Sequence, residues 1–302
     1  MRPLCLVTLA IALAFLLPHV ASEVQADEID RAGAGSFLFD GVGARPLAMG
    51  GSFVAVADDA TAAYWNPAGL GQIEGGGLSA MYADRFSTGL RYQFLNFVSK
   101  GFGVSLLRLN AADVLHVTRR DSLGHPVRSD GTIKHSENAL LVTYGVRINE
   151  NLYLGVTGKG LYHELLENTA KGWGIDAGAL FRNELFGVGI NIQNIKEGRL
   201  IWDNVDETED SIPMNIKAGG AVYLLDGMVT AAADLDIMSE RQVLHLGAEV
   251  WLVKDVLALR SGLQNTDFSA GLGLCIGSFC LDYALQTHTL GLTHRASINL
   301  LF

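Results

Sequence analysis

The feature that most constrains how this chain can fold is a side-chain alternation of period two that recurs along most of its length. In the last segment, Leu292 to Phe302, one face is mostly apolar and the other is mostly polar. Because a strand turns successive side chains to opposite faces, this pattern predicts a β-strand. The same alternation begins at Leu152, Trp173 and Val229. The sequence therefore predicts an all-β fold.

About fourteen such runs can be counted after residue 74. Most of them are close to the roughly 10 residues that a tilted strand needs to cross a bilayer. We predict strands at residues 75–83, 88–98, 101–110, 136–148, 151–164, 171–182, 185–194, 213–224, 228–237, 241–252, 256–263, 267–276, 279–287 and 292–302.

The connections between these runs alternate in length. Every second connection is tight: Ser99-Lys100, Asn149-Glu150, Asn183-Glu184, Leu225-Gly227, Val253-Asp255 and Gly277-Ser278. The others include two long, polar loops, residues 111–135 and 195–212. Bacterial outer-membrane barrels have short periplasmic turns, longer outer loops and an even number of strands. Residues 75–302 are therefore expected to form a transmembrane antiparallel β-barrel of about 14 strands.

The N-terminal part lacks this alternation. Arg2, an apolar run from Leu4 to Leu17 and the small residues after it predict a signal peptide over residues 1–26, and hence export to the outer membrane of a Gram-negative-type bacterium. Residues 27–74 are rich in Gly and Ala. Because the lumen of a barrel of this size must be filled or must conduct, we expect this segment to form a hatch or plug inside it.

The hatch segment contains a dense motif. Residues 43–70 read GARPLAMGGSFVAVADDATAAYWNPAGL. Gly50 and Gly51 permit a backbone reversal, Asp58 and Asp59 are expected to cap a short helix over residues 60–63, and Asn66-Pro67 is a turn pair. The whole stretch resembles the N-terminal signature of the PorV/PorQ family, which belongs to the FadL-like group of outer-membrane barrels.

The resemblance implies a fourteen-stranded barrel whose N-terminal hatch carries an Asn-Pro-Ala motif, here Asn66, Pro67 and Ala68. It leaves open whether Gly50, Gly51, Asp58, Asp59 and these three residues form a fixed plug or a gate that moves. In FadL-type members the implied function is passage of hydrophobic small molecules such as long-chain fatty acids. In PorV-type members it is an accessory or shuttle role in type IX protein secretion. A structural or docking barrel without an open channel is a third possibility.

The implied partners follow from these roles. They are outer-membrane lipid, a hydrophobic small molecule or secretion-system proteins, and the barrel-assembly machinery, whose recognition signal the terminal Phe302 resembles. The position of Phe302 also suits an aromatic girdle at the membrane interface.

The side-chain alternation of period two places charged residues on the polar faces of the strands. If these faces turn inward, the charges either form ion pairs in a solvated interior or line the lumen and select what passes. The residues concerned are Lys159, Asp176, Asp234, Asp236, Glu249, Arg260, Asp282 and Arg295.

Cys275 and Cys280 flank a predicted hairpin turn. A two-residue Gly277-Ser278 turn makes Ile276 and Phe279 the first hydrogen-bonded pair, so the cysteines form the next, non-hydrogen-bonded pair. Such partners lie close enough for a disulfide, and an exported protein meets oxidising conditions. We therefore expect a disulfide rather than two free thiols.

Other functional classes find little support in the sequence. A net charge of −10 without a basic cluster argues against nucleic-acid binding. The scattered histidines show no metal-ligand spacing, and the Gly-Ser pairs lack a nucleophile elbow. We expect no enzyme activity, metal or cofactor.

Overall fold

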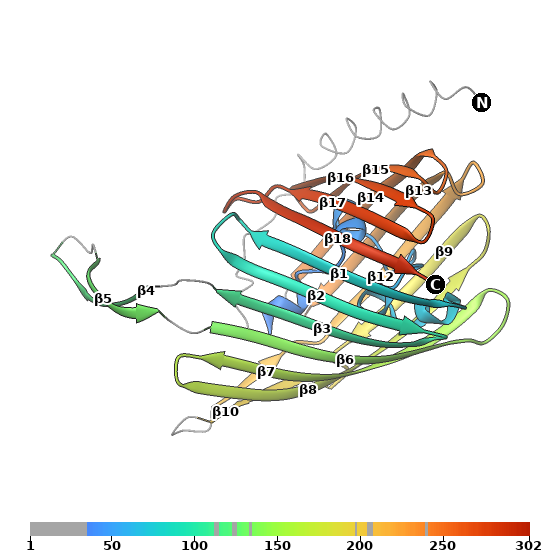
Figure 1. The fold of residues 1–302 in the computed structure, drawn as a ribbon. Coiled ribbons are helices and arrows are strands. Elements are labelled where there is room, and N and C mark those ends of the chain that lie inside the picture. The colour runs from blue at the N-terminus through green and yellow to red at the C-terminus, as the bar shows by residue number, and fades with distance from the viewer. Residues whose placement is uncertain are drawn as a thin grey trace.

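A computed structural model describes residues 35–111, 115–122, 126–132, 135–196, 198–203, 208–238 and 241–302 (Figure 1). The expected signal peptide and the first part of the expected hatch, residues 27–34, lie outside the described residues. Among the described residues, no helix combines the length and the apolar character that crossing a membrane would require.

Fourteen antiparallel strands form a closed barrel, because β1 pairs with both β2 and β18 and β8 pairs with β9. The predicted fold class is thereby confirmed. The barrel strands are β1 (Gly76–Arg85), β2 (Leu90–Ser99), β3 (Phe102–Ala111), β6 (His135–Arg147), β7 (Leu152–Leu165), β8 (Asn168–Arg182), β9 (Phe186–Gln193), β12 (Asn215–Leu224), β13 (Val229–Met238), β14 (Arg241–Val253), β15 (Leu257–Gln264), β16 (Asp267–Ile276), β17 (Phe279–Gln286) and β18 (Thr293–Leu301).

The two ends of the barrel differ in their connections. One end, here called the tight-turn end, carries the short links after β2, β6, β8, β12, β14 and β16. The opposite end, here called the long-loop end, carries the β3–β6 and β9–β12 connections. The expectation that residues 111–135 and 195–212 form plain loops is wrong. They contain the hairpins β4 (Leu115–Arg120) with β5 (Pro126–Thr132) and β10 (Gly198–Trp202) with β11 (Glu209–Ile212).

The second of these hairpins enlarges the barrel wall. β10 pairs with the outer part of β8, so the main sheet continues beyond the closed barrel at the long-loop end (Figure 1). Leu200 and Ile212 are fully buried there. Their burial explains why these two short stretches pair as strands, since each gains an apolar contact with the interior.

Side chains alternate along the barrel strands as the sequence predicted. On β7, Leu154 and Val156 point outward and are 43% and 47% exposed, whereas Thr157 and Lys159 point inward and are buried. On β18, Ile298 points outward and Arg295 and Ser297 point inward. The outer surface is thus apolar, as a lipid-facing barrel requires.

A charge on this outer face gives a direct test of the membrane-facing assignment. Ala177 of β8 pairs with Val156 and Ile192 on the neighbouring strands. Ala177→Arg is expected to lower the free energy of unfolding from bilayers by about 2–4 kcal/mol if the residue lies at mid-membrane. Ala177→Leu, which keeps the surface apolar, should change it little. Equal values for the two variants in denaturant titrations would contradict the assignment.

The hatch segment lies inside the barrel (Figure 1). It comprises η2 (Ser36–Phe39), α2 (Ala44–Ala48), α3 (Ala62–Trp65) and η3 (Pro67–Gln72). α2 contacts β15 to β18, and η3 contacts β6, β7 and β8. Its side chains are almost all buried, including Phe37 and Phe53 with no exposed surface. The hatch therefore supplies most of the hydrophobic core that a hollow barrel would lack.

Candidate functional site

Near the long-loop end, the lumen wall formed by β2, β3, β6, β7, β8 and the β10–β11 hairpin is lined mainly by apolar side chains. Side chains of the hatch and of the surrounding strands form one continuous hydrophobic cluster. We call its long-loop part the apolar chamber and define it by Tyr92, Phe94, Leu107, Leu109, Ala139, Leu141, Leu161, Ala170, Leu200 and Ile212, with Leu90 and Trp202 partly buried at its edge.

The chamber is filled by the chain itself. Phe37 and Leu38 of η2 are buried in it, and the Phe37 ring meets the His163 ring edge-on at a centroid distance of 5.4 Å. The Tyr92 hydroxyl donates to the Phe37 carbonyl at 3.1 Å, and the Tyr64 hydroxyl donates to the Leu38 carbonyl at 2.6 Å. Burial raises the pKa of the Tyr64 hydroxyl, so this group stays protonated as a donor.

The middle of the hatch is bound to the wall by polar contacts. The Asp234 carboxylate accepts from the backbone nitrogens of Phe53 and Val54 at 2.6 and 2.8 Å. His245 Nδ1 lies 2.7 Å from the Gly50 carbonyl oxygen. The Asn66 side chain accepts from the Ala68 nitrogen and donates to the Val54 and Ala179 carbonyls. These contacts satisfy backbone groups that the irregular hatch leaves without helix or sheet partners.

Glycines in the wall let the hatch backbone come this close. A Cβ on Gly262 would overlap the Gly50 nitrogen, and a Cβ on Gly155 would overlap the Pro67 carbonyl carbon. The same holds for Gly178 against the Asn66 side chain. Gly50 and Gly51 themselves have φ angles of 66° and 82°, which favour glycine.

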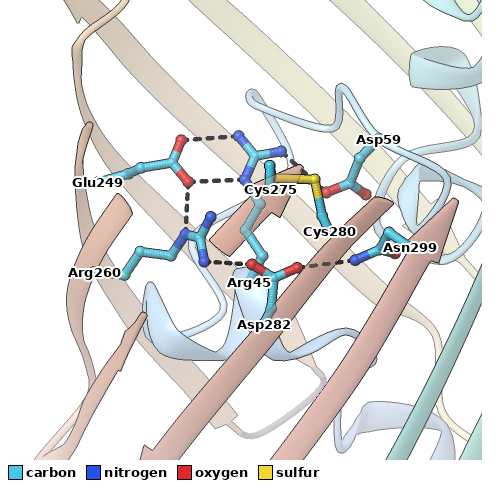
Figure 2. Close-up of a disulfide and its surroundings, with 8 residues drawn as sticks. All are labelled: Arg45, Asp59, Glu249, Arg260, Cys275, Cys280, Asp282 and Asn299. Atoms are coloured by element: carbon cyan, nitrogen blue, oxygen red, sulfur yellow. Dashed lines mark hydrogen bonds and ion pairs between the residues drawn. A yellow bond between two sulfur atoms is a disulfide. The ribbon is translucent and has the colours of Figure 1, made fainter. Parts of the chain in front are cut away.

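The tight-turn side of the hatch carries a partly buried charge network (Figure 2). The Arg45 guanidinium contacts Glu249 at 2.9 Å, Asp58 at 2.6 Å and Asp59 at 3.0 Å. Glu249 also accepts from Arg260 at 2.6 Å. The network continues along the wall, since Arg260 pairs with Asp282 at 2.6 Å and Asn299 donates to Asp282 at 2.9 Å.

Two neighbouring carboxyls of this network differ in proton affinity. Burial disfavours the charged form of Asp58, but the guanidinium groups of Arg45 and Arg182 hold its pKa below the ordinary value. Burial raises the pKa of Asp59, and Arg45 only partly offsets this. As the pH falls, Asp59 is therefore the first of the two to take up a proton.

Between this network and the tight turns lies a cavity of about 1200 Å³, here called the vestibule. Its lining combines hatch residues such as Asp58, Asp59 and Gln72 with residues of five tight turns, including Glu150, Glu184, Asp226 and Asp255. The vestibule thus combines many charged side chains with apolar ones such as Leu224 and Trp251, and it lies on the other side of the hatch from the apolar chamber.

The eight charged residues predicted on the inner faces are all buried inside the barrel, each with 7% exposed surface or less. Lys159 pairs with Asp176 at 2.7 Å, Lys217 pairs with Asp236, and Arg260 bridges Glu249 and Asp282. Asp234 binds hatch backbone instead. Ion pairs, one of the two alternatives read from the sequence, thus occur at several of these positions, and Glu249, Arg260 and Asp282 also line the vestibule.

The predicted hatch residues divide between two places. Gly50, Gly51, Asn66, Pro67 and Ala68 are buried between the hatch and the wall, whereas Asp58 and Asp59 line the vestibule. The expected helix over residues 60–63 is displaced, because α3 covers Ala62–Trp65. No side chain caps it, and Asp59 instead accepts from the Thr61 nitrogen at 2.8 Å.

Cys275 and Cys280 form a disulfide on directly paired positions of β16 and β17, with a Cα–Cα distance of 4.1 Å (Figure 2). Both line the vestibule. Within the described ranges, no group of three or more His, Cys, Asp and Glu side chains could hold a metal ion.

Several interior residues were not predicted from the sequence. Arg45 lay in the quoted motif, but nothing in the motif indicated its partners. Lys217 follows the same period-two rule as Lys159 and could have been found by it. His163 and His245 also lie on inward faces, at 5% and 4% exposure.

Comparisons with known proteins identify the fold. No family model matches the sequence, and no curated protein matches it. Among solved structures, the toluene transporter TodX of P. putida is similar with a TM-score of 0.62 and 12% identity, over 87% of this chain and 99% of that chain. The monoaromatic hydrocarbon channel CymD is similar with a TM-score of 0.59 and 14% identity, over 87% and 98%. At these identities the likeness shows a shared fold, in agreement with the FadL-like part of the sequence resemblance.

Proposed function

We propose that this chain, whose fold is shared with two hydrocarbon channels, resides in a bacterial outer membrane and passes small hydrophobic molecules through its lumen. The apolar outer face supports residence in lipid. The tight-turn end would then face the periplasm, and the long-loop end would face the outside.

The apolar chamber is the observation that carries this proposal. The lumen of a water-filled barrel is polar, whereas the wall of the apolar chamber is lined by buried Leu, Phe, Tyr and Ile side chains. Such a lining suits a ligand that buries apolar surface, at about 25 cal/mol per Å² removed from water.

Entry of a ligand requires that η2 move. Phe37 and Leu38 occupy the chamber as the apolar part of a ligand would. The contacts that must break are the hydrogen bonds from Tyr92 and Tyr64 to their carbonyls and the ion pair between Asp40 and Arg85 at 2.7 Å. Passage onward requires the hatch to rearrange, because α2, α3 and η3 lie between the chamber and the vestibule.

Removal of the Phe37 ring tests the proposal. Phe37→Ala should bind toluene more tightly than the wild type, because the ligand no longer displaces a buried ring and enters a preformed apolar space. Binding to the folded protein in detergent can be followed by equilibrium dialysis of radiolabelled toluene.

Phe53→Ala is the matched control, since Phe53 is an equally buried hatch ring that packs against Trp65 instead of His163. It should bind toluene no better than the wild type. Equal gains from both variants would mean that any interior space takes up the ligand, and no gain from Phe37→Ala would contradict the chamber as the binding site.

The alternative of an accessory role in protein secretion rests on the motif of residues 43–70. It predicts a stable protein partner on the long-loop end, where β4 and β5 project from the barrel (Figure 1). Co-purification of such a partner without any bound hydrophobic molecule would favour this alternative.

A further inference from the structure

Two polar side chains interrupt the apolar lining of the chamber. His163 of β7 and Glu137 of β6 are direct register partners near the long-loop ends of their strands, and both lie on the inner face. His163 is 5% exposed and contacts the Phe37 ring, so it faces the space that η2 fills. One Glu137 oxygen, Oε1, lies 3.2 Å from His135 Nε2.

One polar atom on each of these two side chains lacks a partner. Within the part of the chain that the structure describes, neither His163 Nε2 nor Glu137 Oε2 makes a hydrogen bond, although both atoms are buried. A buried polar atom without a partner costs about 1–3 kcal/mol. Phe37 offers only carbon atoms to this pair, so a ligand that supplied the missing partners would gain affinity over a ligand that did not.

A hydroxyl group supplies both partners at once. Its hydrogen can be donated to the Glu137 carboxylate, and its oxygen can accept from His163 Nε2–H. A hydrocarbon offers neither interaction. A carboxylate can accept from His163 but brings a negative charge into the same site as Glu137, and two like charges in one site repel.

From this geometry we propose that the chamber selects neutral apolar molecules that carry one hydroxyl group, such as phenols, and that Glu137 and His163 bind the hydroxyl. The inference rests on the proposed function and narrows its substrate class. It assigns the pair a role in specificity, while the surrounding Leu, Phe and Tyr side chains hold the apolar body of the ligand.

Phenol, toluene and benzoate are suitable probes, because they share one ring and differ in a single substituent. Their dissociation constants would be measured by equilibrium dialysis on the full-length mature protein and on Phe37→Ala, in which the site is open. Phenol is expected to bind at least about tenfold more tightly than toluene, since it satisfies two buried polar atoms. Benzoate is expected to bind more weakly than phenol.

Two variants separate the roles of the pair. His163→Phe keeps a ring but removes the nitrogen that binds the hydroxyl. The ratio of phenol affinity to toluene affinity should therefore fall to about the ratio of their partition coefficients into detergent micelles. Glu137→Gln keeps an acceptor oxygen but removes the charge, so phenol binding should persist while benzoate binding improves. Heat-dependent mobility on gels establishes that each variant is folded.

The outcomes are distinguishable. Equal binding of phenol and toluene, unchanged by His163→Phe, would overturn the inference and leave the proposed function standing. Benzoate binding that is the same in Glu137→Gln as in the protein with Glu137 would also overturn the inference. Failure of all three probes to bind either protein would overturn the proposed function itself.

Discussion

Lys159→Met is expected to lower the free energy of unfolding by about 3–5 kcal/mol, because it leaves a buried carboxylate without its counter-charge. Lys159 and Asp176 lie on adjacent strands at 2.7 Å, with side chains about 4% exposed. The Asp176 carboxylate also accepts from the Asn194 nitrogen at 2.9 Å. Guanidinium titration of the protein in lipid vesicles measures the change.

The double variant Lys159→Met/Asp176→Asn provides the control. It removes both charges, and the side-chain amide oxygen introduced on β8 can still accept from the Asn194 nitrogen. It should recover much of the lost stability, since replacing a whole buried pair costs far less than breaking it. A single variant as stable as the wild type would mean that water reaches this part of the lumen and that the hatch does not seal it.

Gly262→Val is expected to dislodge the hatch from the wall. The new Cβ would overlap the Gly50 nitrogen and the Met49 carbonyl carbon, which are backbone atoms and cannot rotate away. Overpacking of this kind costs about 1–3 kcal/mol, so the displaced state should become roughly 5- to 150-fold more populated. Protease cleavage within residues 35–74 should accelerate by a similar factor, because cleavage follows the population of the open form.

Gly160→Val is the matched control for this substitution. Gly160 also lies within a strand, but it is exposed on the outer face and an added Cβ would meet nothing within 4 Å. Its hatch should be cleaved at the wild-type rate. If Gly262→Val were cleaved no faster, the close contact between hatch and wall would not be what retains the hatch.

The barrel could be predicted from the sequence because each strand shows its alternation within its own residues. Alternation along each strand depends only on which side chains face lipid and which face the interior, and the strand bounds at β7 and β18 differ from the predicted ones by a single residue at each end. The hairpins β4–β5 and β10–β11 were missed because their strands are short and lie within stretches rich in charged residues. The pairing of β10 is set by the neighbouring wall rather than by its own pattern.

The interior could be predicted only in part. Period two placed Glu249 and Arg260 on the inner face, but it could not supply their third partner, Arg45, which lies 204 residues before Glu249 in the chain. The hatch has no regular period, so nothing in its sequence indicates which wall residue each group meets. For the same reason the division into an apolar chamber and a charged vestibule came only from the structure.

The proposed passage of small hydrophobic molecules is tested most directly by uptake across an outer membrane that contains lipopolysaccharide. Such a membrane admits hydrophobic molecules only slowly without a channel. Cells that express this chain should accumulate radiolabelled toluene and phenol faster than cells with an empty vector, and cells that express the Phe37→Ala variant should accumulate them faster still. Uptake at the empty-vector rate, with the folded barrel present in the outer membrane, would contradict the claim that this chain passes small hydrophobic molecules.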